Sequence, residues 1–264
     1  MTMDPWLDSR RLIDEQLKLQ VEISFPRHHA FMTKNGLDEC DSVLDLGTGN
    51  GEFLSRLAAH HPEINFFGVD DKPHMIKQAG KRQISNVSWS MGDANQLDSI
   101  PMIKKADGIL MRYFILHLPN MKKVLADMAK LAKKGATLWI FDLDLDHFFC
   151  NPPHPSFDMI KSLLERFCER YSMDTRAGSL LPPLLEEAGF TLMEKEIEPF
   201  TNRELDQLLF QRFVSGEVTL YHRFLDGKPD SGDFREMNRF IREEMGSDRL
   251  VQYGMVMISA RAGR

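Results

Sequence analysis

Short apolar runs alternate with amphipathic segments along most of this 264-residue chain. Most of these runs are four to eight residues long and bounded by turn formers, and several are followed by a segment with apolar residues at helical spacing, which predicts strands followed by helices. The repeated alternation predicts an α/β domain whose sheet carries helices on both faces. The predicted strands are 43–46, 65–70, 87–91, 106–111, 137–141, 190–197 and 250–260.

The segments outside this alternation predict helices. Residues 4–24 form an amphipathic pattern that should end or bend at Pro26, with a second short helix over 28–34. Further helices are predicted over 157–171 and 178–188. Residues 202–245 are mostly helical in pattern, interrupted at 226–232, and rich in aromatic side chains.

The stretch from Val43 to Phe53 predicts a buried strand, a glycine turn and the start of a helix. Glycines there allow positive φ and a close approach by a ligand. The fingerprint for dinucleotides needs a small residue where this chain has Glu52, and a second carboxylate, Asp45, precedes the turn. Carboxylates beside a helix N-terminus favour a ligand with a cationic group over a phosphate, and no Gly-Lys-Ser/Thr is present to form a P-loop.

The run Asp45-Leu-Gly47-Thr-Gly49-Asn-Gly51 resembles the first motif of the class I S-adenosylmethionine-dependent methyltransferases. The resemblance covers roughly residues 41–199 and the final strand. It implies a Rossmann-like, doubly wound seven-stranded sheet, mostly parallel with an antiparallel last strand, plus a helical cap. It also implies S-adenosyl-L-methionine as cofactor and S-adenosyl-L-homocysteine as product.

Two later strand ends carry further residues of this resemblance. Asp70 ends the second strand, where the family binds the ribose hydroxyls, although Asp71 beside it is also a candidate helix cap before Pro73. Gly92-Asp93-Ala94 resembles the family's adenine-binding turn. The residues expected to bind the cofactor are Asp45, Gly47, Thr48, Gly49, Gly51, Asp70, Asp71, Met75, Gly92, Asp93, Ala94, Met111, Arg112 and Arg27, the last towards the methionyl carboxylate.

Catalytic candidates follow from the chemistry of methyl transfer, which needs alignment and a dry site, and a base only for a protonated acceptor. His117 is the first candidate base, followed by His147 and Tyr113, although each also suits a structural role. No metal is expected. Asp142 and Asp144 alternate at the end of the fifth strand, but Arg112 stands where a magnesium-dependent relative needs a carboxylate. The two aspartates are therefore interpreted as carboxylates at the rim of a pocket or as solvated loop residues.

Composition limits the acceptor and the compartment. A net charge of −6 argues against a nucleic-acid partner. Three cysteines without a Cys-x-x-Cys pair, a charged N-terminus and the lack of a long apolar run predict a cytoplasmic protein away from membranes.

The predicted function is therefore methyl transfer to oxygen, nitrogen or carbon of a small molecule, by a monomer or homodimer. The alternatives are an RNA or protein methyltransferase and a non-catalytic cofactor-binding module. The predicted organisation is one methyltransferase domain, with a helical cap at 1–40, the cofactor-binding core at 41–199, a helical lid at 200–249 and the last strand at 250–264.

Overall fold

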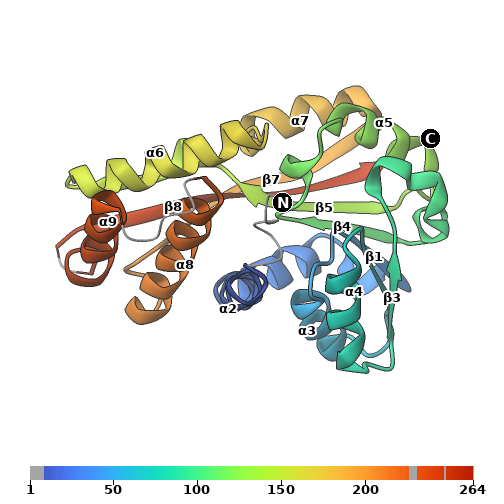
Figure 1. The fold of residues 1–264 in the computed structure, drawn as a ribbon. Coiled ribbons are helices and arrows are strands. Elements are labelled where there is room, and N and C mark those ends of the chain that lie inside the picture. The colour runs from blue at the N-terminus through green and yellow to red at the C-terminus, as the bar shows by residue number, and fades with distance from the viewer. Residues whose placement is uncertain (1–8, 226–230, 247, 264) are drawn as a thin grey trace, which may run out of the picture. The chain divides into compact units, whose positions relative to one another are not determined.

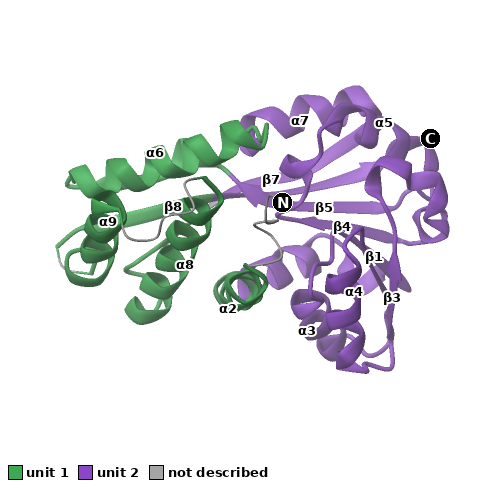
Figure 2. Cartoon of the chain, viewed as in Figure 1, with its two compact units in different colours: residues 1–24, 144–175, 199–254 green, residues 25–143, 176–198, 255–264 purple. Residues whose placement is uncertain are grey.

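The computed structural model describes residues 9–225, 231–246 and 248–263. Contacts within the chain group it into two compact units, coloured separately in Figure 2. Unit 1 comprises residues 1–24, 144–175 and 199–254, and unit 2 comprises residues 25–143, 176–198 and 255–264. Helix α2 (Arg10–Lys34) and strands β7 (Phe190–Thr201) and β8 (Leu250–Ala262) contribute residues to both units.

Unit 2 is built on a twisted, mainly parallel sheet (Figure 1). Its strands run in the order β3-β2-β1-β4-β5-β8; the first five are parallel to their neighbours, and β8 is antiparallel to β5. The sheet confirms the predicted α/β fold class with its antiparallel last strand. The bounds are β1 Ser42–Leu46, β2 Asn65–Asp70, β3 Val87–Met91, β4 Gly108–Arg112 and β5 Thr137–Leu143.

Burial explains why these segments form the centre of the sheet. Val43 and Leu44 in β1 have no exposed surface, and Trp139 in β5 is equally buried, as parallel strands covered on both faces require. Helices α5 (Met121–Leu131) and α7 (Ala177–Ala188) cover one face, and α3 (Glu52–His60) and α4 (Pro73–Ala79) cover the other (Figure 1). Because β1 lies between β2 and β4, the chain reverses its winding direction at the carboxyl end of β1, where open sheets bind ligands.

Unit 1 contains helices α6 (Pro155–Arg170), α8 (Gln207–Leu225) and α9 (Gly232–Glu243), which pack against one another. A short strand, β6 (Phe149–Asn151), pairs with the start of β8. This strand was not predicted from the sequence, because three residues are too few to show an alternating pattern. The Tyr253 ring is the centre of the aromatic core of this unit and contacts Phe148, Phe200, Phe210 and Phe213.

Two sequence predictions about helices are wrong. Helix α2 continues through Pro26 to Lys34, so the chain does not divide there into two separate helices. The apolar side chains of Phe25, Phe31 and Met32 are all buried, and this burial outweighs the loss of one backbone hydrogen bond at proline. At α4 the cap position is Lys72, so Asp71 is not the cap. Residues 4–8 of the predicted N-terminal helix and residues 226–230 of the predicted interruption lie outside the described part of the chain.

Short 3₁₀ turns link several of the strands and helices. They are η1 Leu37–Glu39, η2 Gly80–Arg82, η3 Ala94–Ser99, η4 Pro101–Lys104, η5 Ile115–His117 and η6 Leu145–His147.

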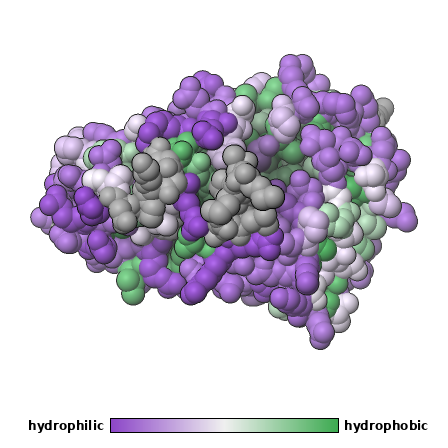
Figure 3. Space-filling model, viewed as in Figure 1, coloured by the Kyte–Doolittle hydropathy of each residue, from purple (hydrophilic) through white to green (hydrophobic). Residues whose placement is uncertain are grey.

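On the face of the molecule seen in Figure 3, hydrophilic residues predominate. Among the described residues, no helix combines the length and the apolar character that crossing a bilayer requires.

Candidate active site

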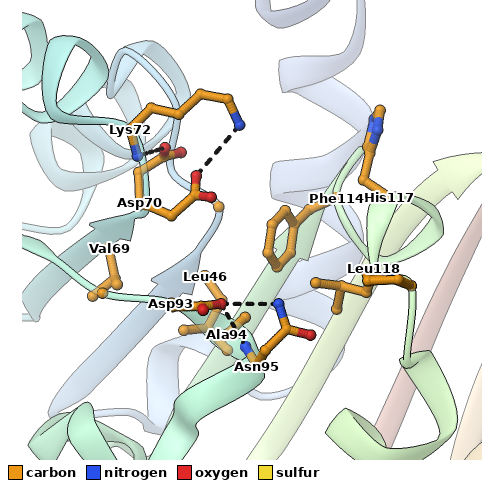
Figure 4. A pocket seen from close by; sticks show the side chains of 14 residues that line it. Leu46, Val69, Asp70, Lys72, Asp93, Ala94, Asn95, Phe114, His117 and Leu118 are labelled. Carbon is orange, nitrogen blue, oxygen red and sulfur yellow. Dashed lines mark hydrogen bonds and ion pairs between the residues drawn. The ribbon is translucent and has the colours of Figure 1, made fainter. Parts of the chain in front are cut away.

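A cavity of about 180 Å³ opens in unit 2 at the carboxyl ends of the strands. We call it the cofactor pocket, because it lies where the sequence resemblance predicts the cofactor to bind. Four chain segments form its wall: the end of β1, the end of β2, the turn after β3 and the loop after β4. The lining residues are Leu46, Gly47, Val69, Asp70, Asp71, Lys72, Gly92, Asp93, Ala94, Asn95, Phe114, His117, Leu118 and Pro119 (Figure 4).

Asp70 joins the second strand to residues 47–51, the segment between β1 and α3 that we call the glycine loop. Its Oδ2 accepts a hydrogen bond from the N–H of Gly49 at 2.9 Å, and its Oδ1 accepts one from the N–H of Lys72 at 2.9 Å. Burial raises the pKa of this carboxyl, although the two backbone hydrogen bonds oppose the shift. Asp71, by contrast, is exposed and pairs with the ammonium of Lys72 at 3.3 Å. Of the two aspartates, Asp70 is therefore the one held in a fixed orientation at the pocket.

The turn after β3 brings a second carboxylate to the pocket. Asp93 Oδ1 accepts hydrogen bonds from the backbone N–H of Asn95 at 2.8 Å and from its side-chain amide at 2.9 Å. The backbone hydrogen bond is the main reason why the pKa of Asp93 lies below its ordinary value. A Cβ at Gly92 would lie 2.6 Å from the side chain of Val69, so glycine allows this turn to pack on β2.

Gly47 lies against an aromatic ring of the chain itself. Its φ is +79°, and a Cβ there would lie 2.4 Å from the ring of Phe114. The sequence suggested that glycine here admits a ligand to the backbone, yet in the structure Phe114 makes the close approach. The glycine loop and the loop after β4 therefore pack closely against each other where Phe114 meets Gly47.

Charged groups are buried beneath the glycine loop. Asp45 accepts a 2.7 Å hydrogen bond from Thr48 Oγ1 and is 3% exposed. Burial raises its pKa to about 6, while Thr48 and Arg112 oppose that shift. The guanidinium of Arg112 lies over the rings of Phe53 and Tyr113, at 4.5 and 4.9 Å from their centroids. Burial lowers the pKa of Arg112, against the influence of Tyr113, Asp45 and Asp142.

Glu52 was expected to be a second carboxylate beside the ligand, and this expectation is wrong. Glu52 pairs with the guanidinium of Arg82 at 2.6 Å and does not line the cofactor pocket. Its partner comes from η2, more than twenty residues further along the chain, which the spacing of the motif could not reveal.

The three candidate bases lie in different surroundings. His117 lines the cofactor pocket and is exposed; partial desolvation by the surrounding atoms, followed by the charge of Lys72, lowers its pKa to about 4. Tyr113 has a φ of +51°, and its hydroxyl contacts the sulfur of Met255. His147 belongs to unit 1, where its Nδ1 lies 3.6 Å from Asp144 Oδ1. Only His117 of the three lines the cofactor pocket.

Several other residues expected at the site do not line the pocket. Met75 and Met111 are buried, at 6% and 0% exposure. A Cβ at Gly51 would lie 2.7 Å from the Trp89 ring, so Gly51 serves packing. Arg27 lies on α2 next to His28, and its charge contributes to lowering the pKa of that histidine.

Sequence reasoning missed Phe114 and Lys72 at the pocket and the environment of His28. His28 is fully buried, its ring stacks on Phe141 at 4.0 Å, and neither ring nitrogen has a hydrogen-bond partner among the described residues. Burial, followed by the charges of Arg112 and Arg27, holds its pKa well below the ordinary value. Phe114 could have been found from its position two residues after a strand end; nothing in the sequence marks His28.

The described residues fit a nucleoside with a cationic tail better than a metal. Half-buried Asp70 and Asp93 each retain acceptor capacity beyond their backbone partners, as ribose hydroxyls and an adenine amine require. Within the described residues, no group of three or more histidine, cysteine or carboxylate side chains could hold a metal ion.

Comparisons with known proteins agree with this geometry. Residues 37–189 match a family model described as a methyltransferase domain. An O-methyltransferase of Aspergillus nomiae is 26% identical over 156 residues, which cover 58% of this chain and 65% of that protein. A tRNA (guanine-N(7)-)-methyltransferase of Mycoplasmopsis agalactiae is 38% identical over only 63 residues, covering 22% of this chain and 31% of that enzyme. The chain thus spans less than two thirds of either relative.

A solved structure shares the fold. Phosphoethanolamine N-methyltransferase 2 of Haemonchus contortus, in complex with phosphomonomethylethanolamine and S-adenosylhomocysteine, superposes with a TM-score of 0.52 at 14% identity. The superposition covers 85% of this chain and 49% of that one. At this identity the likeness concerns the fold alone.

Proposed function

We propose that this chain, which belongs to the class I S-adenosylmethionine-dependent methyltransferases, methylates a small organic acceptor. S-adenosyl-L-methionine is its cofactor and S-adenosyl-L-homocysteine its product. The observation that carries the proposal is the cofactor pocket, in which carboxylates from the ends of β2 and β3 face one cavity beside the glycine loop. The match to the O-methyltransferase over more than half of the chain supports oxygen as the methylated atom, and the net charge of −6 supports a small acceptor over a nucleic acid.

The cofactor supplies a methyl group on a cationic sulfonium, and the group that leaves is neutral. The chain therefore has to orient the reactants and exclude water. Asp70 would accept hydrogen bonds from ribose hydroxyls, and Asp93 from the adenine amine. Phe114, Leu118 and Pro119 would shield the pocket from solvent. The buried carboxyl of Asp45, beneath the loop, favours positive charge above it.

For an acceptor that arrives protonated, His117 is the first candidate base, followed by His147 and Tyr113. The pKa of about 4 leaves the imidazole of His117 neutral near pH 7 but makes it a weak base, because a general base works best with a pKa near the operating pH. His117 stands first because it lines the cofactor pocket. We also propose that no metal takes part. Asp142 is used as an acceptor for backbone amides, and Asp144 accepts from the N–H of Asp146 at 3.2 Å.

Unit 1 is the proposed source of acceptor selectivity. The residues that link β7 to β8 form α8 and α9 instead of a short turn, and long connections of this kind commonly carry function. The predicted roles of residues 1–40 and 200–249 as cap and lid remain part of this proposal.

The test follows the methyl group into fractions of a cell lysate. The purified chain is incubated with S-adenosylmethionine labelled in its methyl group and with the small-molecule, RNA and protein fractions separately. Label in the small-molecule fraction is expected. Label in RNA would instead support the second candidate, an RNA methyltransferase, which the short match to the tRNA enzyme favours and the net charge of −6 opposes. Label in protein would reject the small acceptor, and no label in any fraction would reject turnover.

A further inference from the structure

The carboxylate of Asp142 lies inside unit 2 and faces backbone amides of a neighbouring loop. Asp142 is in β5 and is 2% exposed. Its Oδ1 accepts a 2.9 Å hydrogen bond from the N–H of Leu143, and its Oδ2 lies 3.5 Å from the N–H of Leu116. The amides of Phe114 and Ile115 also act on this carboxylate. One side chain of β5 thus accepts hydrogen bonds from the backbone amides that begin the turn after β4.

Those amides begin a turn that contains no hydrogen-bond acceptor for them. The 3₁₀ turn η5 has Phe114 at its cap position, and no side chain there caps it. The first amides of a helical turn lack partners within the turn and need an acceptor from outside. Asp142 supplies this acceptor from the adjacent strand, at a buried site that water does not reach.

The same loop forms one wall of the cofactor pocket. We call residues 112–119 the pocket-wall loop; Phe114, His117, Leu118 and Pro119 within it line the cavity. Tyr113 at its start has a φ of +51°, a conformation that is unfavourable for a bulky residue, and its N–H donates a 2.7 Å hydrogen bond to Phe141 O. A strained loop of this kind keeps its shape only when its surroundings hold it.

We propose that Asp142 is a positioning residue for cofactor binding. By holding the amides at 114–116, its carboxylate sets the conformation of the pocket-wall loop and therefore the place of Phe114 against Gly47. The proposal rests on the proposed function only in taking this cavity as the cofactor site. It differs from a role in overall stability, which every buried, hydrogen-bonded carboxylate has.

The charged neighbour of Asp142 offers a competing explanation. The guanidinium of Arg112, from β4, interacts with both Asp142 and Asp45. If Asp142 acted only by balancing that charge, loss of its carboxylate would disturb Arg112 and leave the amides of the pocket-wall loop protected. Exchange of the loop amides with solvent therefore distinguishes the two roles.

The experiment compares Asp142→Ala and Asp142→Asn with Glu217→Ala. Glu217 is a matched control because it is also a buried carboxyl, 4% exposed, but it belongs to unit 1. The measurements are S-adenosylhomocysteine affinity by calorimetry, the thermal midpoint, and hydrogen–deuterium exchange of peptides covering 112–119. Asp142→Ala should weaken binding at least tenfold and speed exchange in these peptides. Asp142→Asn, which keeps one acceptor oxygen, should recover part of both.

Glu217→Ala should lower the thermal midpoint yet leave the affinity within about twofold, as for independent sites, because Glu217 does not line the cofactor pocket. Equal losses of affinity in Asp142→Ala and Glu217→Ala, or unchanged exchange at 112–119, would overturn the proposal. If Asp142→Ala does not fold, the same exchange measurement on Asp142→Asn and wild type tests the proposal. Faster exchange at 112–119 in Asp142→Asn would support it, and unchanged exchange would overturn it. A wild-type protein that binds no S-adenosylhomocysteine would reject the cofactor site itself, while the exchange data would still report on the loop.

Discussion

The backbone N–H of Gly49 donates a 2.9 Å hydrogen bond to Oδ2 of Asp70, and this bond joins the loop after β1 to the end of β2. The other carboxylate oxygen of Asp70 accepts from the N–H of Lys72, at the cap position of α4. One side chain thus fixes both loops that form this side of the cofactor pocket. It also retains lone pairs that can accept from a ligand.

Asp70→Ala should weaken S-adenosylhomocysteine binding by about 1–3 kcal/mol, the range for hydrogen bonds to a charged group. The physical reason is the loss of a charged acceptor that is already oriented by two backbone amides. Titration calorimetry of the purified variant measures this change directly.

The matched control for Asp70 is its exposed neighbour. Asp71→Ala should change the affinity little, because Asp71 pairs only across the surface with Lys72 in the described contacts. An equal or larger loss at Asp71 would show that the wrong aspartate has been assigned to the ribose.

Gly47→Ala should lower the thermal midpoint more than Gly135→Ala does. Both glycines have nearly the same φ, +79° and +80°, so each substitution carries about 1–2 kcal/mol of backbone strain. A Cβ at Gly47 would also lie 2.4 Å from the Phe114 ring, while nothing lies within 4 Å of one at Gly135. The extra loss at Gly47 should be about 1–3 kcal/mol, as is usual for overpacking.

A double variant tests the cause of that extra loss. Adding Phe114→Ala to Gly47→Ala removes the ring that the new methyl group would meet, so the two changes should be less than additive. Strict additivity, measured by a thermal double-mutant cycle, would mean that Gly47 and Phe114 are not coupled.

The sheet and its strand ends could be predicted because the signals for them are local. Buried strands produce short apolar runs, and the glycine turn and the aspartates after β2 and β3 follow those runs directly. Asp70, Gly92 and Asp93 could therefore be placed at one edge of the sheet from the amino-acid sequence alone.

The features that could not be predicted depend on contacts between distant residues. Pro26 looks like a helix end in sequence, yet burial of its apolar neighbours keeps α2 continuous. In the sequence, nothing distinguishes Phe114 from other apolar residues; its contact with Gly47 is seen only in the structure. The carboxyl of Asp142 suggested a metal ligand or a rim residue, whereas its actual partners include an amide more than twenty-five residues away.

Chelators should leave methyl transfer unchanged. Among the described residues no metal-binding group forms, and Asp142 and Asp144 accept hydrogen bonds from backbone amides instead of facing a shared site. Activity is measured before and after treatment with EDTA, with magnesium added back as the control. Loss on treatment and recovery with magnesium would assign these aspartates to a metal site.

The last prediction concerns the buried carboxyl of Glu217 in α8. Gln16 Nε2 donates a 2.7 Å hydrogen bond to its Oε1, and the Tyr253 hydroxyl in the same core has no hydrogen-bond partner among the described residues. Burial raises the pKa of Glu217 to about 7, although hydrogen bonds from Gln16 and Gln20 act in the opposite direction. The folded state therefore holds this proton at pH values where the unfolded chain has lost it. Stability should fall as the pH rises from about 4.5 to about 7.

Glu217→Gln should remove this part of the pH dependence, because an amide of the same shape does not ionise. Relative to wild type, the variant should gain about 3 kcal/mol between pH 5 and pH 8, which follows from a shift of about 2.5 pH units. The buried Asp45 and Asp142 also have raised pKa values, but they occur in both proteins and cancel in the difference. Thermal midpoints at the two pH values provide the measurement, with Glu165→Gln on the exposed surface of α6 as the control. If Glu217→Gln changes the midpoint equally at both pH values, the carboxyl is already ionised in the folded protein, and the core of unit 1 must hold a charge.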